Sequence, residues 1–237
     1  MIRLALLTTL ALTVATPLAA HHIWIEPDPH GVSQLRFGEF GDNLHEVSGK
    51  LLDRVQPNAR LVSASGEAPV AIKRGETGLA LSGRVGPGES LVAEDDRFPV
   101  SERKSGDAVT RSVYRPAARF VSDLAERKPS LILDVVPTAE AGRFRVTLRG
   151  APLAKAKVKV IAASGWEREA RTDEAGLFEA SFPWKGLYAL EVHHADRTPG
   201  TRGSEAYDLT NFVTTLTFTQ DSGLEPPPPP PAAKPNG

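Results

Sequence analysis

The chain has 237 residues and is close to neutral, with 28 Lys and Arg against 29 Asp and Glu and a formal net charge of −1. This balance, without a basic stripe that carries interleaved aromatic residues, argues against nucleic acid as a partner. Cysteine is absent, so no disulfide framework supports the fold, and the chain has to bury enough apolar surface to fold unaided.

Residues 1–20, MIRLALLTTLALTVATPLAA, have the pattern of a secretory signal peptide. Arg3 supplies the positive charge, an apolar run follows, and small residues precede the expected cut after Ala20. The apolar run is short for a helix that crosses a bilayer of about 30 Å, and no other stretch is long enough. We therefore expect a periplasmic protein with no transmembrane segment after processing, whose first residue is His21.

The next residues predict strands. In HIWIEP, residues 22–27, Ile23 and Ile25 alternate with His22, Trp24 and Glu26. Because neighbouring strand residues point to opposite faces, the two isoleucines are expected inside and the other three residues together on the other face. Further short runs separated by Gly and Pro predict an N-terminal β domain over residues 21–95.

Residues 96–129 are charged and contain few strand formers. Within them, Val113, Phe120 and Leu124 recur at roughly helical spacing, and Pro116 suits a first helical turn. This pattern predicts a partly helical connector, with one helix over residues 113–127.

Strands return over residues 130–220, which read as a second β domain. AKVKVIAA at 156–163 and GLYALEVHH at 186–194 are strands, TDEAG at 172–176 is a turn, and LTNFVTTLTFTQ at 209–220 is a final strand. The strand count is typical of an immunoglobulin-like or transthyretin-like sandwich. The predicted fold class is therefore mainly β, with two β-sandwich domains joined by a short helical connector. The Pro-rich tail, 221–237, is expected to be polyproline II or disordered.

Two adjacent histidine pairs carry the functional prediction. After cleavage, His21 would offer both its α-amine and its imidazole to one ion. His193 shares a strand face with Glu191, and Glu26 shares the face of His22. Imidazoles from both ends of the chain, with one carboxylate, predict a metal site. Its candidate ligands are His21, His22, His193, His194 and Glu26.

Alternatives remain open for several of these residues. A histidine near a strand end is often only a solvated polar residue, and His30 and His45 are expected at the surface. His45 with Asp42 and Glu46 is a reserve ligand set. Asp196 and Asp208 are further carboxylates within reach of the late histidines. The tryptophans either stack on sugar rings or pack in the core; they are Trp24, Trp166 and Trp184.

Nickel, cobalt, copper and zinc all accept imidazole ligands, and a chain without cysteine and with Met1 as its only methionine is not expected to bind copper(I). Imidazole together with carboxylate suits a divalent ion of the harder kind. The sequence contains no Gly-rich phosphate loop, no G-x-S-x-G and no H-E-x-x-H. We therefore expect a binding protein and not an enzyme. The alternative is a non-catalytic module that binds a glycan or an envelope protein.

The motifs AAHHIWIEP, LDVVP, GAPLAKAKVKV, RTDEAGLF, GLYALEVHH and TTLTF occur in an order that resembles one bacterial periplasmic domain family of unknown function. That family is filed with the periplasmic components of nickel and cobalt uptake systems. The resemblance runs from the signal peptide to the tail. It implies a binding protein for nickel or cobalt, with copper or zinc as alternatives, that is accessory to metal uptake and has an inner-membrane permease or outer-membrane receptor as partner. The family's two histidine positions would match His21 or His22 and His193 or His194.

Overall fold

The computed structural model describes residues 21–236, so the predicted signal peptide lies outside the described residues. The prediction of a mainly β protein is confirmed: these residues form strands in several sheets and contain no α-helix. The helical element among them is a short 3-10 turn, η2 (Leu51–Arg54). No helix of this part of the chain has the length and apolarity that crossing a bilayer requires.

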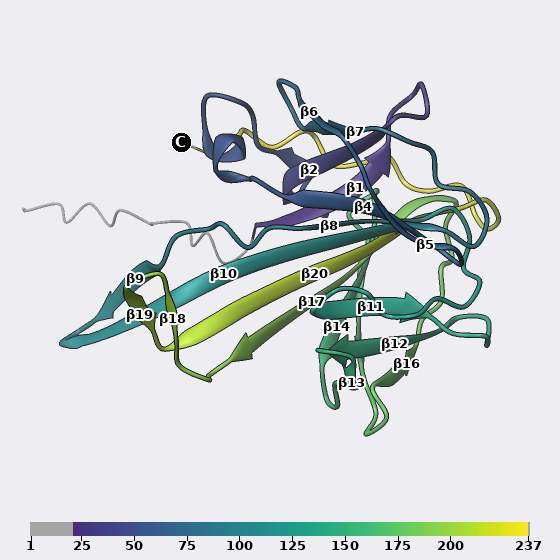
Figure 1. Cartoon of the computed structure of the whole chain (residues 1–237). Helices are drawn as coiled ribbons and strands as arrows, with labels where there is room; N and C mark the ends of the chain where they lie inside the picture. The colour runs from purple at the N-terminus through teal and green to yellow at the C-terminus, as the bar shows by residue number, and fades with distance from the viewer. Residues whose placement is uncertain (1–20, 237) are drawn as a thin grey trace, which may run out of the picture.

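A nine-stranded sheet crosses the whole molecule (Figure 1). Its order is β15-β14-β17-β20-β10-β8-β4-β5, and β9 pairs with β10. β10 and β20 run parallel, and the other pairs of this sheet are antiparallel. The strands are β4 (Asn58–Ser63), β5 (Gly66–Pro69), β8 (Ser90–Glu94), β9 (Ser101–Ser105), β10 (Ala108–Val121), β14 (Lys157–Ala162), β15 (Glu167–Arg171), β17 (Gly186–Asp196) and β20 (Leu209–Gln220).

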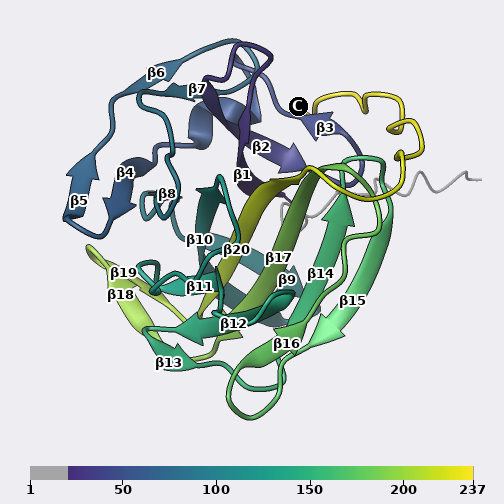
Figure 2. The ribbon, with the colours of Figure 1, turned by 90° about the vertical axis from the view of Figure 1, so that its right-hand side faces the viewer.

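Two smaller sheets lie against the central sheet, one toward each end of the strand order (Figures 1 and 2). The first has the order β1-β2-β7-β6, with β3 on β2, and the second has the order β11-β12-β13, with β16 on β12. A separate hairpin, β18–β19, lies beside the start of β10. The strands are β1 (His22–Pro27), β2 (Ser33–Glu39), β3 (Leu44–His45), β6 (Ile72–Arg74), β7 (Leu79–Leu81), β11 (Leu133–Pro137), β12 (Arg143–Leu148), β13 (Ala151–Pro152), β16 (Leu177–Glu179), β18 (Gly200–Arg202) and β19 (Glu205–Tyr207).

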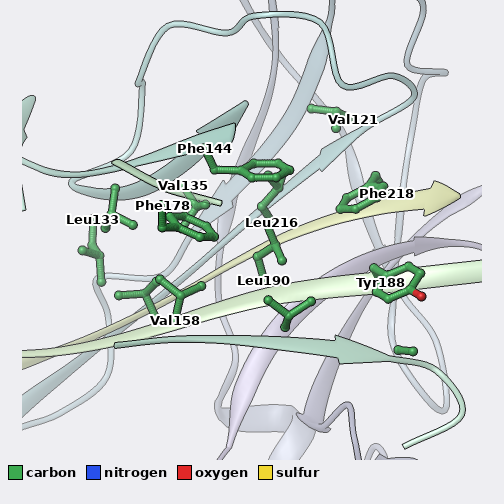
Figure 3. Packing of buried hydrophobic residues seen from close by; sticks show 14 of the residues in the cluster. Val121, Leu133, Val135, Phe144, Val158, Phe178, Tyr188, Leu190, Leu216 and Phe218 are labelled. Carbon is green, nitrogen blue, oxygen red and sulfur yellow. The ribbon is translucent and has the colours of Figure 1, made fainter. Parts of the chain in front are cut away.

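Each small sheet builds its own core with one face of the central sheet. Figure 3 shows the larger core, in which Phe144 and Phe178 of the β11–β13 sheet meet Leu190 and Phe218 of the central sheet. The second core joins the β1 sheet, through side chains such as Ile23, to the other face. The predicted inward orientation of the first-strand isoleucines is confirmed, because both are fully buried there.

Strand β1 is fixed to the central sheet by hydroxyl groups. Thr215 Oγ1 on β20 donates to the Ile23 carbonyl at 2.8 Å, and Thr217 Oγ1 donates to the Ile25 carbonyl. Buried carbonyl groups need such partners, because water cannot reach them. The Tyr114 hydroxyl on β10 also donates to the His21 carbonyl, at 2.6 Å. The residues at the start of β1 are therefore held at defined positions over β10 and β20.

The prediction of a helical connector is wrong. Residues 113–121 belong to β10, and the charged residues 101–112 form an exposed ribbon of β9 and β10. Ala118 and Phe120 face one core, whereas Val121 faces the other. A central strand buried on both faces carries apolar residues at odd and even positions, and this hides the two-residue period. Pro116 is tolerated because β8 begins to pair only beyond it, from Ala117 onward.

The central sheet takes strands from both predicted domains, 21–95 and 130–220. The two halves are thus joined by strand pairing and not by a helix. The comparison of residues 130–220 with an immunoglobulin-like or transthyretin-like sandwich stays a prediction.

The Pro-rich tail returns to the β1 sheet. Leu224 exchanges backbone hydrogen bonds with Pro183 and Lys185. Further along, Asn43 Nδ2 donates to the Pro230 carbonyl at 2.9 Å, and the Ala233 N–H donates to the Asn43 carbonyl at 3.2 Å. Figure 2 shows this yellow segment looping beside β3. Prolines lack N–H groups but still accept through their carbonyl groups, as Pro230 does, while the N–H groups of Leu224 and Ala233 donate.

Candidate metal centre

His21 directly precedes β1 and lies between two carboxylates. Its Nε2 is 2.7 Å from Glu46 Oε1, and its Nδ1 is 3.5 Å from Glu39 Oε1. His21 is 3 % exposed and Glu46 is 0 % exposed, so the contact between them is shielded from water. We refer to His21, Glu39 and Glu46 as the amino-terminal cluster.

The corner between β2 and β3 brings the two carboxylates to His21. Glu39 is the last residue of β2, and Glu46 directly follows β3, where its N–H donates to the Phe37 carbonyl at 2.8 Å. Gly38 pairs with His22 on one side and with His45 on the other. Its φ of +147° is open to glycine, and an added Cβ would overlap with the Leu44 carbonyl oxygen.

The two ring nitrogens of His21 have different surroundings. A carboxylate only accepts hydrogen bonds, so the short contact to Glu46 places a proton on Nε2. In the neutral ring, Nδ1 then carries a lone pair. This Nδ1 is buried without a hydrogen-bond partner and faces Glu39. Burial, and next a hydrogen bond with Asp42, raise the pKa of Glu39.

A second cluster lies beside the first. Glu191 of β17 is 3.0 Å from His22 through its Oε2 and 2.6 Å from His193 Nε2 through its Oε1. Lys159 Nζ is 3.9 Å away. Burial raises the pKa of Glu191, but the charges of His22 and His193 and the His193 hydrogen bond outweigh it and lower the pKa to about 2. Glu191 is therefore an ionised carboxylate in an almost dry position.

His22 uses its nitrogens differently from His21. Its Nε2 accepts the Phe40 N–H at 3.2 Å, so the proton of the neutral ring lies on Nδ1, next to Glu191. The lone pair that an ion would need is thus engaged by the backbone. In this arrangement His22 links β1 to Glu191.

Both clusters border one cavity of about 380 Å³. Glu39 belongs to its wall and also contacts His21, so the cavity connects the two clusters. The wall includes the imidazoles of His22 and His193. Its carboxylates are Glu39, Asp42, Glu167 and Glu191, and its ammonium groups are Lys157 and Lys159. The wall thus holds four carboxylates and two ammonium groups besides the two imidazoles. A metal ion that displaced the imidazole protons would face a wall in which carboxylates outnumber ammonium groups.

The structure brings together His21, His22 and His193 of the predicted ligands, but not Glu26 or His194. Glu26 pairs with Arg36 at 2.8 Å and accepts the Trp24 indole N–H at 2.8 Å. His194 lies on the opposite face of β17 from Glu191, because neighbouring strand residues alternate.

The other weighed residues have separate roles. Asp196 pairs with Arg149 at 2.7 Å, and Asp208 accepts the Arg111 N–H at 2.7 Å. His45 packs against Trp24 with the ring centroids 5.3 Å apart and the ring planes tilted by 43°, and burial lowers the pKa of His45. His30 is exposed, with its N–H donating to Asp28.

The tryptophans belong to the cores. Trp24 is fully buried, and Trp166 and Trp184 pack against the core of Figure 3. No observation on these three rings favours stacking on a sugar.

Sequence reasoning did not find the roles of Glu39, Glu46 and Glu191. Glu46 appeared in the reserve set with His45, but it contacts His21 instead. The available signal was the acidic segment GEFGDNLHE after the second strand. In residues 21–236, no group of three or more His, Cys, Asp or Glu side chains is arranged to hold a metal ion by itself.

The fold and these clusters define a mainly β protein with a charged cavity next to the start of its first strand. Comparisons with known proteins add no relative. No protein-family model matches the chain, and neither a curated protein nor a solved structure matches it.

Proposed function

We propose that the processed protein, beginning at His21, binds one divalent transition-metal ion, nickel or cobalt, without catalysing a reaction. The observation that carries this proposal is the buried Nδ1 of His21, which has no hydrogen-bond partner and faces Glu39. Nδ1 is also the ring nitrogen nearer to the α-amine. The amine and Nδ1 of one residue can therefore close a chelate ring around one ion.

The two carboxylates of the amino-terminal cluster have different roles in the proposed site. Glu39 supplies an anionic oxygen. A bound dication would favour its ionised form, against the burial that raises the pKa of this carboxyl. Glu46 accepts from Nε2 and orients the ring, as outer carboxylates do for metal-bound histidines. The α-amine of His21 is the remaining ligand. It is a backbone group, and it becomes free only when the signal peptide is cleaved.

The cavity would receive the other side of the ion. Its carboxylates outnumber its ammonium groups and would complement a dication. His193 borders the cavity and has a side chain that is 40 % exposed, so the ion would enter and leave on that side. The family resemblance of the sequence supports the same setting, a periplasmic protein accessory to metal uptake. A permease or an outer-membrane receptor would then be the partner.

Equilibrium dialysis of the processed protein against nickel, cobalt, copper and zinc tests the proposal. We expect nickel or cobalt to bind with a Kd below about 10 μM. The matched control carries one alanine ahead of His21, which keeps the imidazole but moves the amine away. That extension should weaken binding at least about tenfold. Equal affinity with and without the extension would remove the amine from the site.

Glu39→Gln and Glu26→Gln form a second matched pair, because both replace a carboxylate near β1. Only Glu39 faces His21, whereas Glu26 is engaged by Arg36. We expect Glu39→Gln to weaken nickel binding and Glu26→Gln to leave it unchanged. The reverse result would restore the ligand assigned from the sequence.

A further inference from the structure

We infer that Asn236 in the Pro-rich tail is a positioning residue for the amino-terminal cluster, which it stabilises by holding Glu46. The expected effect on metal affinity rests on the proposed function, whereas the contacts of Asn236 do not. It assigns a role to a tail that the sequence presents as a solvated segment.

Asn236 makes several contacts with Glu46. Its N–H donates to Glu46 Oε1 at 3.3 Å and to Oε2 at 3.2 Å, and its Nδ2 donates to Oε1 at 2.9 Å. The same Nδ2 lies 3.3 Å from His21 Nε2. Residues 21 and 236, almost a full chain length apart, thus meet at one carboxylate.

Glu46 requires these donors. It is 0 % exposed, and a buried carboxylate without hydrogen-bond donors is strongly destabilised. His21 Nε2 supplies one donor, and Asn236 supplies its backbone and amide groups. Without Asn236, Glu46 would have to turn toward water or recruit water, and in either case its hold on the His21 ring weakens.

Two attachment points and a stiff proline run fix the path of the tail that leads to Asn236. The tail is tied at Leu224 to Lys185 and at Pro230 to Asn43, and the Pro230 ring lies beside Gly165, where an added Cβ would be in ordinary contact with it at 3.5 Å. The run Pro226–Pro231 has fixed φ angles, so little backbone entropy is lost when it is ordered. A proline strap between two tethers can therefore span the surface and still present its end at a defined place.

The effect on the site follows from the tautomer of His21. While Glu46 is held, the ring proton lies on Nε2 and the lone pair lies on Nδ1, the nitrogen of the chelate. When Glu46 is released, the proton can move to Nδ1, where it blocks the ion. Asn236 acts through Glu46 on His21, without contact with the ion.

The experiment uses the processed full chain with ¹⁵N-labelled histidine, in two arms. Nitrogen chemical shifts of the metal-free protein report the His21 tautomer, and nickel titration reports affinity. For the wild type we expect the proton on Nε2. For Asn236→Ala we expect a mixture of tautomers and about tenfold weaker nickel binding. Asn236→Gln, which keeps the amide, should recover part of both, and the exposed neighbour change Lys234→Ala should alter neither.

The two arms fail separately. An unchanged His21 tautomer and unchanged affinity in Asn236→Ala overturn the positioning role and leave the proposed metal site intact. A tautomer that shifts in Asn236→Ala, in a protein whose wild type binds no metal, supports the positioning role and removes the proposed function.

Discussion

At the scale of single residues, Glu191 shows how the two ends of the chain are joined. Strand alternation alone places His193 on the face of Glu191, and the structure agrees. The contact of Glu191 with His22, 169 positions earlier, is a tertiary contact that no local pattern reveals. The sequence predicts imidazoles from both ends of the chain around one ion, and the structure brings His22 and His193 to one carboxylate.

Glu191 makes stability depend on pH in a defined window. Its pKa falls from an ordinary 4.5 to about 2, because the imidazoles outweigh its burial. A carboxyl group with a lowered folded-state pKa adds stability above its unfolded pKa and loses it as the pH falls toward the folded value. The contribution of Glu191 is therefore complete above about pH 4.5 and disappears toward pH 2.

We expect Glu191→Gln to lower the free energy of unfolding by about 3 kcal/mol at pH 7, since it removes one partner from a buried charge cluster. It should also flatten the pH dependence below pH 4.5, which urea unfolding at several pH values measures. Glu167→Gln is the control, because Glu167 borders the same cavity but is exposed. Similar losses in both variants would contradict the role given to burial.

At the scale of elements, the corner between β2 and β3 determines the amino-terminal cluster. The sequence predicts β2, but the corner depends on Gly38, whose tight contact with the Leu44 carbonyl is tertiary. The sequence alone does not show this corner, so Asp42, His45 and Glu46 were interpreted as a local ligand set because they are close in sequence. In the structure, Glu46 contacts His21 and His45 contacts Trp24.

Gly38→Ala should destabilise the protein by at least about 2 kcal/mol, because a side chain is strained at this φ and overlaps with backbone. Gly31→Ala is the matched control. It also has a positive φ, of +75°, but nothing lies within 4 Å of its added Cβ, so about 1 kcal/mol is expected. Thermal unfolding of both variants measures the difference. Equal losses would show that the tight corner is not what makes Gly38 necessary.

β10 gives the matching lesson about elements. Its apolar residues alternate correctly once the strand is known, but each face is covered by a different core. A strand covered on both faces loses the polar half of its pattern, so the helical interpretation of 113–127 was wrong for a physical reason. For the opposite reason, the edge strand β15, EREAR, was not predicted, because its residues are largely exposed and show no apolar alternation.

At the scale of the whole molecule, the parallel pair of β10 and β20 unites the halves. Residues 112–120 pair with residues 209–217, so neither half contains a complete central sheet. Parallel pairing between distant segments has no local sequence signal, and for this reason the sequence favoured two separate sandwiches.

Fragments ending or starting near residue 129 should therefore not fold alone. We expect residues 130–220 by themselves to unfold without a cooperative transition, because β20 would expose the edge that β10 covers. The intact processed chain should unfold in a single transition, as seen by circular dichroism and tryptophan fluorescence together. A fragment with a sharp transition of its own would contradict a shared sheet.

The most direct test of the account is a structure of the nickel-loaded processed protein. We expect an ion bound by the α-amine and Nδ1 of His21, with Glu39 as a further ligand and with Glu46 still accepting a hydrogen bond from Nε2 of the same ring. An ion held by His193, or by His21 through Nε2 with Glu46 displaced, would contradict it.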